Sequence, residues 1–104
     1  MIAAKLPAQT EKAFQAQVVA LARTLGYSCY HTFDSRHSAA GFPDLAVWRP
    51  GRFILAELKT DAGKLTPPQA GTIMELDAAG VEAYVWRPRD WAGIVEILQG
   101  AVSQ

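Results

Sequence analysis

One stretch decides how this chain folds: Asp44-Leu45-Ala46-Val47-Trp48-Arg49-Pro50-Gly51-Arg52-Phe53-Ile54-Leu55-Ala56-Glu57-Leu58-Lys59. Two largely apolar runs, residues 44–48 and 53–58, flank a turn sequence with proline at its second position and glycine at its third. Proline and glycine favour a tight turn at those positions, and apolar runs of this length are typical of buried strands. The stretch therefore predicts a β-hairpin centred on Pro50 and Gly51.

Charged residues gather at the open end of this hairpin. The turn pairs Trp48 with Phe53 and, further along, Asp44 with Glu57, while Lys59 shares the face of Glu57 because side chains alternate along a strand. Opposed carboxylates destabilise a sheet, so a compensating charge is required. Two compensations stay open, a bound divalent cation or a structural salt-bridge network. A loop of different length would shift the register and separate the pair.

The composition of this cluster suits one kind of reaction. Carboxylate oxygens without a thiol favour a hard cation such as Mg²⁺ or Mn²⁺. Such an ion polarises a phosphoryl oxygen and activates an attacking water, and an adjacent lysine stabilises the negative charge that develops. If the cluster binds a cation, it indicates phosphodiester hydrolysis.

The segment before the hairpin is predicted to hold a helix and a strand. Apolar residues recur at helical spacing after Thr10, a suitable N-cap, and Gly26 stands where a left-handed residue ends a helix. Residues 27–33 are rich in aromatic side chains and end in turn formers, so they predict a first strand.

The segment after the hairpin is predicted to add helix, strand and helix. Thr66, Pro67 and Gln69 form a capping-box start for a helix that ends at Gly80. Residues 81–86 form a fourth strand, and Asp90 caps a last helix that reaches residue 100. The order α-β-β-β-α-β-α predicts an α/β fold with a mixed sheet flanked by helices.

Length and composition limit what the chain can be. With 104 residues, half of them hydrophobic, it is expected to form a single domain over residues 1–104. Its single cysteine, Cys29, excludes a disulfide framework and a cysteine-rich metal site. No targeting segment or membrane span is apparent, so an intracellular, cytoplasmic protein is expected. Residues 1–52 hold six basic and three acidic residues and the remainder four and seven, which weakly favours a basic face.

These motifs together resemble a known nuclease class. Gly41-Phe42-Pro43-Asp44-Leu45, Ala56-Glu57-Leu58-Lys59 and Leu65-Thr66-Pro67-Pro68-Gln69 look like the PD-(D/E)xK nuclease superfamily, and in particular its VRR-NUC (virus-type replication-repair nuclease) family. The resemblance covers roughly residues 11–86. It implies a restriction-endonuclease-like αβββαβ core.

The resemblance also implies roles for individual residues. Asp44 and Glu57 would bind a divalent metal, Mg²⁺ or Mn²⁺, with the backbone carbonyl of Leu58 as a further ligand, and Lys59 would be the catalytic lysine. Gln69 matches a glutamine that supports the site or contacts DNA. That residue is also the capping-box glutamine, and both roles can hold.

Two further positions qualify the resemblance. Glu11 matches a first-helix acidic residue near the metal, and a helix-dipole role for this acid stays open. A tyrosine found four residues after the glutamine in some relatives is replaced here by Ile73, which argues against the RecB-like branch.

Candidate DNA contacts lie in two polar segments. Arg36, His37 and Ser38 precede Asp44, and Lys64 precedes the second helix; all four offer donors to phosphate, with ordinary surface solvation as the alternative. His31 is expected to be a packed strand residue rather than a metal ligand.

The predicted function is a metal-dependent DNA endonuclease that cuts structured, branched DNA and resembles a Holliday junction resolvase. The alternatives are a monomeric flap or nicking nuclease and a catalytically idle DNA-binding or replication-partner module. Apolar residues crowd the last helix, which favours a homodimer; they are Trp91, Ile94, Val95, Ile97 and Leu98. Replication or repair proteins are possible partners, a membrane is not, and the expected host is a bacterial or phage-infected cell.

Overall fold

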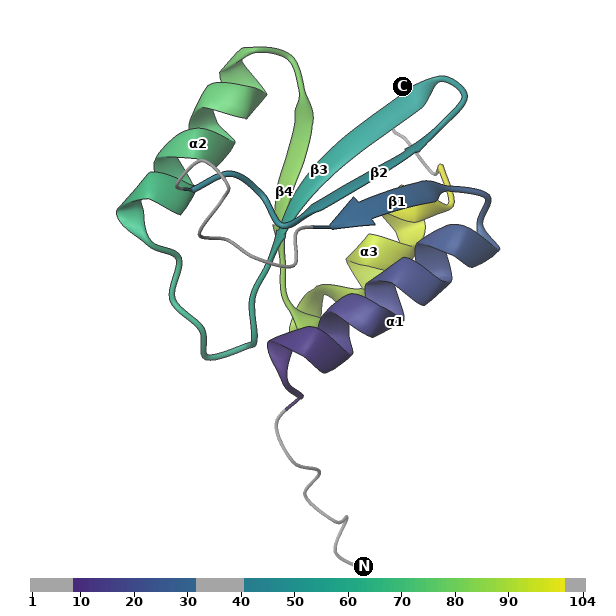
Figure 1. Cartoon of the computed structure of the whole chain (residues 1–104), viewed down its shortest axis with the longest axis horizontal. Helices are drawn as coiled ribbons and strands as arrows, with labels where there is room; N and C mark the ends of the chain where they lie inside the picture. Colours follow the sequence, from purple (N-terminus) through teal and green to yellow (C-terminus); the bar gives the residue numbers. More distant parts are fainter. Residues whose placement is uncertain (1–8, 32–40, 101–104) are drawn as a thin grey trace, which may run out of the picture.

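The computed structural model describes residues 9–31 and 41–100. Figure 1 shows a sheet with helices on both of its faces. In chain order the elements are α1 (Glu11–Thr24), β1 (Ser28–His31), β2 (Leu45–Arg49), β3 (Arg52–Leu58), α2 (Pro67–Ala78), β4 (Glu82–Trp86), the 3₁₀ turn η2 (Pro88–Asp90) and α3 (Trp91–Leu98). This is the predicted α/β fold with the predicted order of helices and strands.

The sheet is mixed, as predicted. Its strand order is β1-β2-β3-β4, with β1, β2 and β3 antiparallel in turn and β4 parallel to β3. Within the hairpin Arg49 pairs with Arg52 and Leu45 with Ala56, which is the predicted register. Gly51 takes a φ of 82°, a left-handed conformation that glycine adopts without strain. The turn thereby brings the residues that follow β3 opposite those that precede β2.

The core lies between the sheet and the pair α1 and α3. Phe14 and Val18 of α1 and Ile94 of α3 are buried against the sheet side chains that point the same way. The strand residues of this cluster are Leu45, Val47, Ile54, Ala56, Leu58 and Trp86. Because side chains alternate along β3, Leu55 and Glu57 point to the opposite face, which α2 partly covers.

The helix ends follow the predicted capping residues in two of three cases. The Thr10 hydroxyl accepts a hydrogen bond from the Ala13 amide at 3.0 Å, and Gly26 takes a φ of 89° after the last turn of α1. The capping box of α2 forms as predicted. Asp90 occupies the predicted N-cap position of α3, but its side chain makes no capping hydrogen bond to that helix. Its carboxylate accepts from the Arg87 amide at 2.9 Å and closes η2 instead, because Pro88 starts a 3₁₀ turn there.

Among the described helices none is long and apolar enough to cross a membrane.

Candidate active site

Asp44 and Glu57 meet at the end of the hairpin. Glu57 lies in β3 and is only 2% exposed, while Asp44 lies directly before β2 and is partly exposed. The Asp44 carboxylate accepts a hydrogen bond from the Leu58 amide at 3.3 Å, so it is anchored to the strand that carries Glu57. The Leu58 side chain is buried in the core, and therefore only its backbone faces the site.

Gln69 links the second helix to this site. Its side-chain carbonyl accepts from the Thr66 amide at 2.9 Å, and its side-chain amino group donates to Glu57 Oε2 at 3.0 Å. The capping contact fixes the orientation of the amide, because the oxygen is committed to the Thr66 amide and the nitrogen is left for the carboxylate. One side chain thus caps α2 and contacts Glu57, the two uses that the sequence left open.

Lys59 supplies the nearest positive charge. Its Nζ lies 3.8 Å from Glu57 Oε2, and its side chain is 13% exposed. Lys59 follows the last residue of β3, and its backbone amide donates to the Trp86 carbonyl at 3.0 Å. The ammonium group therefore lies beside the Glu57 carboxylate with little solvent around it.

The environment of Glu57 opposes its negative charge. The pKa of its carboxyl is raised to about 8, mainly by burial and further by the adjacent Asp44 carboxyl; the charge of Lys59 counters the rise, and Glu11 adds a smaller contribution to it. Oxygen Oε1 is buried and receives no hydrogen bond from a described donor. A buried carboxylate with an unused oxygen, beside a second carboxylate, is short of positive charge. A hard divalent cation fits this need, and the donor set suits it.

Glu11 lies at the margin of this cluster. Partial burial raises the pKa of its carboxyl, the charge of Asp44 raises it further, and Lys59 lowers it. In residues 9–31 and 41–100, however, no three His, Cys, Asp or Glu side chains lie together as a metal-binding group. The protein therefore offers two close carboxylates, and Glu11 stays a candidate beside them.

Gly41 explains how the segment before Asp44 is placed. A Cβ atom built on it would lie 2.4 Å from the Pro68 carbonyl oxygen and 3.0 Å from the Gln69 amide nitrogen, and its φ is 84°. Only glycine fits both the left-handed backbone and the close approach to the start of α2. The loop that carries Asp44 therefore packs directly on the helix turn that carries Gln69.

Of the remaining predicted residues, only Lys64 and His31 lie in the part of the chain that the structure describes. Arg36, His37 and Ser38 fall outside the described residues, and Lys64 is exposed in the connection between β3 and α2. His31 ends β1 and is half-buried.

Sequence reasoning missed two features near the site. A cleft of about 520 Å³ runs along α1 and is lined by Glu11, Lys12, Gln15, Ala16, Val19, Arg23 and His31. The helical spacing of its α1 residues is the signal that could have revealed it. The Arg87 guanidinium donates to the carbonyls of Thr60 and Gly63 at 2.6 Å each, a contact for which the sequence holds no local signal.

Known proteins share this fold and these motifs. The family model of the VRR-NUC domain matches residues 5–90. A solved structure described as a VRR_NUC domain protein superimposes with a TM-score of 0.70 at 23% identity, covering 89% of this chain and 88% of that one. The Holliday junction resolvase Hjc of Archaeoglobus fulgidus, an archaeal hyperthermophile, superimposes with a TM-score of 0.55 at 20% identity, covering 73% and 67%. No curated protein matches the chain.

The fold and the match define the class of protein. An αβββαβ core with an aspartate before one strand and a Glu-x-Lys at the end of the next has the organisation of the PD-(D/E)xK nucleases. With the family model spanning most of its length, the chain belongs to the VRR-NUC family.

Proposed function

We propose that this chain is a metal-dependent endonuclease that hydrolyses phosphodiester bonds in branched DNA. The observation that carries the proposal is Glu57, which is buried against Asp44 with an oxygen that no described donor satisfies. Burying a carboxylate oxygen without a hydrogen-bond partner costs free energy, and a purely structural role of Glu57 gives no reason for that cost. Membership of a nuclease family agrees with this interpretation.

The residues have distinct roles in this proposal. Asp44 and Glu57, with the Leu58 carbonyl, would hold Mg²⁺ or Mn²⁺, which supplies charge to polarise the phosphoryl oxygen when bound. Gln69 holds the Glu57 carboxylate in position through Oε2. Lys59 orients the attacking water or stabilises the negative charge of the transition state. Glu11 lies at the margin, close enough for its charge to act on the site.

The proposal also specifies the substrate, branched DNA, and the assembly, a homodimer. The chain shares its fold with a Holliday junction resolvase, and because the sequence identity is only 20%, this likeness shows the fold alone. One site per chain cannot cut both strands of a junction symmetrically, whereas a two-fold pair presents two sites. We further propose that the chain acts in the cytoplasm of a bacterial or phage-infected cell, with replication or repair proteins as its partners.

One observation favours a second candidate, an idle DNA-binding module. The ion pair between Lys59 and Glu57 is also what a purely structural network would show. A single set of assays separates the candidates. The purified chain is incubated with a four-way junction, a flap and plain duplex DNA, with Mg²⁺, with Mn²⁺ or with a chelator, and Asp44→Asn serves as the matched inactive control.

The proposal predicts metal-dependent cleavage of the junction, little cleavage of the duplex, and none by Asp44→Asn. Cleavage of the flap alone by a monomer would favour the flap nuclease. If the wild type binds DNA and cuts none of the three substrates with either metal, the chain is a binding module and the proposal is wrong.

A further inference from the structure

A cleft runs along the solvent face of α1 next to the edge strand β1. Its volume is about 520 Å³, and His31 of β1 contributes to its lining. The lining residues of α1 are Glu11, Lys12, Gln15, Ala16, Val19 and Arg23. From Lys12 these positions recur at three, four, seven and eleven residues, which places them on one stripe of the helix. The opposite stripe, with Phe14, is buried in the core.

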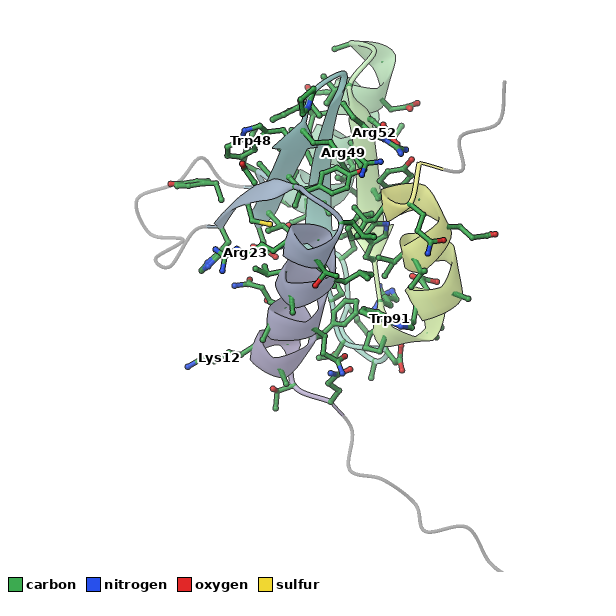
Figure 2. The ribbon with its side chains drawn as sticks, turned by 90° about the vertical axis from the view of Figure 1, so that its right-hand side faces the viewer. Lys12, Arg23, Trp48, Arg49, Arg52 and Trp91 are labelled. Atoms are coloured by element: carbon green, nitrogen blue, oxygen red, sulfur yellow. The ribbon has the colours of Figure 1, made fainter. Side chains whose placement is uncertain are left out.

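The described lining of the cleft has a basic residue near each end of α1, Lys12 and Arg23. Lys12 and Arg23 are exposed, and Figure 2 shows both side chains on the same side of α1, away from α3. Glu11, at one end, is the only acidic residue among the described residues of the lining. The two basic residues are separated by about 16 Å along the helix axis, at a rise of about 1.5 Å per residue. Roughly five nucleotides of one DNA strand span this length, at about 3.4 Å per nucleotide.

Arg23 lies close to the neighbouring strand β1. Burial raises the pKa of the Cys29 thiol in β1, and the nearby charge of Arg23 counters that rise, so the exposed Arg23 side chain lies on the side of α1 that faces β1 and the cleft. Arginine in this setting is suited to phosphate, because its planar group presents several donors in fixed directions.

The cleft leads to the carboxylate cluster. Glu11 lines its end, and the charges of Asp44 and Lys59 both act on the Glu11 carboxyl. A strand lying in the cleft would therefore arrive beside the residues proposed to cut it. The other face of the sheet is less favourable, because α2 carries exposed Glu75 and Asp77 and no basic residue.

We propose that this α1 cleft binds the sugar-phosphate backbone of the DNA strand that enters the active site. Lys12 and Arg23 each neutralise one phosphate, and the Gln15 amide supplies a neutral donor between them. The inference rests on the proposed nuclease function and adds the path of the substrate to it.

The test is DNA binding as a function of salt, measured without divalent metal so that cleavage does not interfere. Fluorescence anisotropy of a labelled four-way junction is recorded between about 50 and about 300 mM NaCl. The proteins compared are the wild type, Lys12→Ala, Arg23→Ala and the double variant. Lys12→Arg keeps the charge at its position, and Arg89→Ala removes an equal charge from an exposed arginine in η2, outside the cleft lining.

Each alanine variant is expected to lower the slope of log affinity against log salt by about one, and the double variant by about two. Affinity at low salt falls roughly tenfold per residue. Lys12→Arg keeps the wild-type slope, and Arg89→Ala leaves it unchanged. Thermal melts check the fold of each variant, and Lys12→Gln and Arg23→Gln replace any alanine variant that is destabilised.

Wild-type slopes in both single variants and in the double variant would overturn the inference, and so would an equal loss in Arg89→Ala. Both results leave the proposed nuclease function standing as long as the wild type cleaves. If the wild type neither binds nor cleaves any of the substrates, the proposed function itself fails.

Discussion

Among the described residues, Glu57 is the one charged side chain that the fold buries. Its contacts compensate only part of the cost: Gln69 donates to Oε2, and Lys59 lies 3.8 Å from the same oxygen, while Oε1 has no described donor. Both compensating groups act on the same oxygen and leave the other one free. This asymmetry is what a metal ligand requires, since a free carboxylate oxygen must face the ion.

The pKa of Glu57 predicts a specific pH dependence of stability. Folding raises this pKa from its ordinary value of 4.5 to about 8. The stabilising, protonated form is therefore fully present below the lower value and is lost as the pH rises through the higher one. Without divalent ions, Glu57→Gln is expected to gain melting temperature relative to the wild type between about pH 5 and about pH 9, because glutamine stays neutral.

The measurement is a series of thermal melts of both proteins in chelator, and Glu75→Gln on exposed α2 is the control. A constant difference in melting temperature between Glu57→Gln and the wild type over this range would show that burial does not act on Glu57 as described.

The sequence predicts the two carboxylates of the site, but it does not predict the contacts that hold them in place. A two-residue turn at Pro50 and Gly51 gives the register that places Asp44 opposite Glu57, and the structure has this register. The contact of Gln69 with Glu57 depends on how α2 crosses the sheet, which no local pattern encodes. The role of Gly41 likewise appears only when the Pro68 carbonyl is seen beside it.

At the scale of the elements, capping residues and turn residues predicted most boundaries. Thr10 and Thr66 start α1 and α2, and Gly80 takes a φ of 85° after α2. Helix α3 starts directly after Asp90, as predicted, but the Asp90 side chain does not cap it, because its carboxylate accepts from a nearer amide, that of Arg87. A capping residue can serve either of two adjacent turns, and the sequence does not say which.

Arg87 contacts the connection between Lys59 and the helix of Gln69, the two residues whose side chains lie against Glu57 Oε2. Residues 59–66 run from Lys59 to the N-cap of Gln69's helix, and the Arg87 guanidinium bridges the carbonyls of Thr60 and Gly63 within them. The neighbouring residue, Trp86, accepts from the Lys59 amide. Trp86, the last residue of β4, and Arg87, directly after it, therefore fix the backbone at Lys59 and in the residues that follow it.

Arg87→Ala is expected to lower kcat by between about 10- and 100-fold with a smaller change in KM, because a displaced lysine misses the reacting atoms. Arg87→Lys restores part of the rate, since lysine reaches one carbonyl but not both. Steady-state cleavage of the junction measures this. Arg52→Ala is the matched control: that arginine binds Glu82, away from the site, so its loss should lower stability and leave kcat nearly unchanged. Equal effects of Arg52→Ala and Arg87→Ala on kcat would reduce Arg87 to a stabilising residue.

At the scale of the whole molecule, most of the exposed large apolar side chains in the described residues lie outside the last helix, where Trp91 alone is among them. Ile94 and Leu98 of α3 are buried, so most of the helix packs on its own sheet. Exposed aromatic residues lie on the other face of the sheet, where Trp48 pairs with Phe53 and Tyr30 lies on the neighbouring strand; they are 40%, 49% and 62% exposed. Figure 2 shows Trp48 and Trp91 on opposite sides of the molecule. Adjacent exposed aromatics are typical of interfaces.

A homodimer is expected to use this sheet face. Sedimentation equilibrium at micromolar concentration should give a dimer mass for the wild type and for Trp91→Arg, and a monomer mass for Trp48→Arg. Both substitutions place the same charge at a partly exposed tryptophan, so they differ only in location. A monomer mass for the wild type, alone and bound to a four-way junction, would contradict the dimer and favour a monomeric nuclease.

The most direct test of the account is the cleavage rate of a four-way junction as a function of Mn²⁺ concentration, for the wild type, Asp44→Asn and Lys59→Ala. The account predicts a saturable rate for the wild type and no cleavage by Asp44→Asn at any concentration, because a ligand is lost. Lys59→Ala should saturate at a similar metal concentration with a far lower plateau, because the lysine acts on the transition state. Cleavage by Asp44→Asn at the wild-type rate and metal dependence would contradict the claim that Asp44 and Glu57 form a metal-dependent catalytic site.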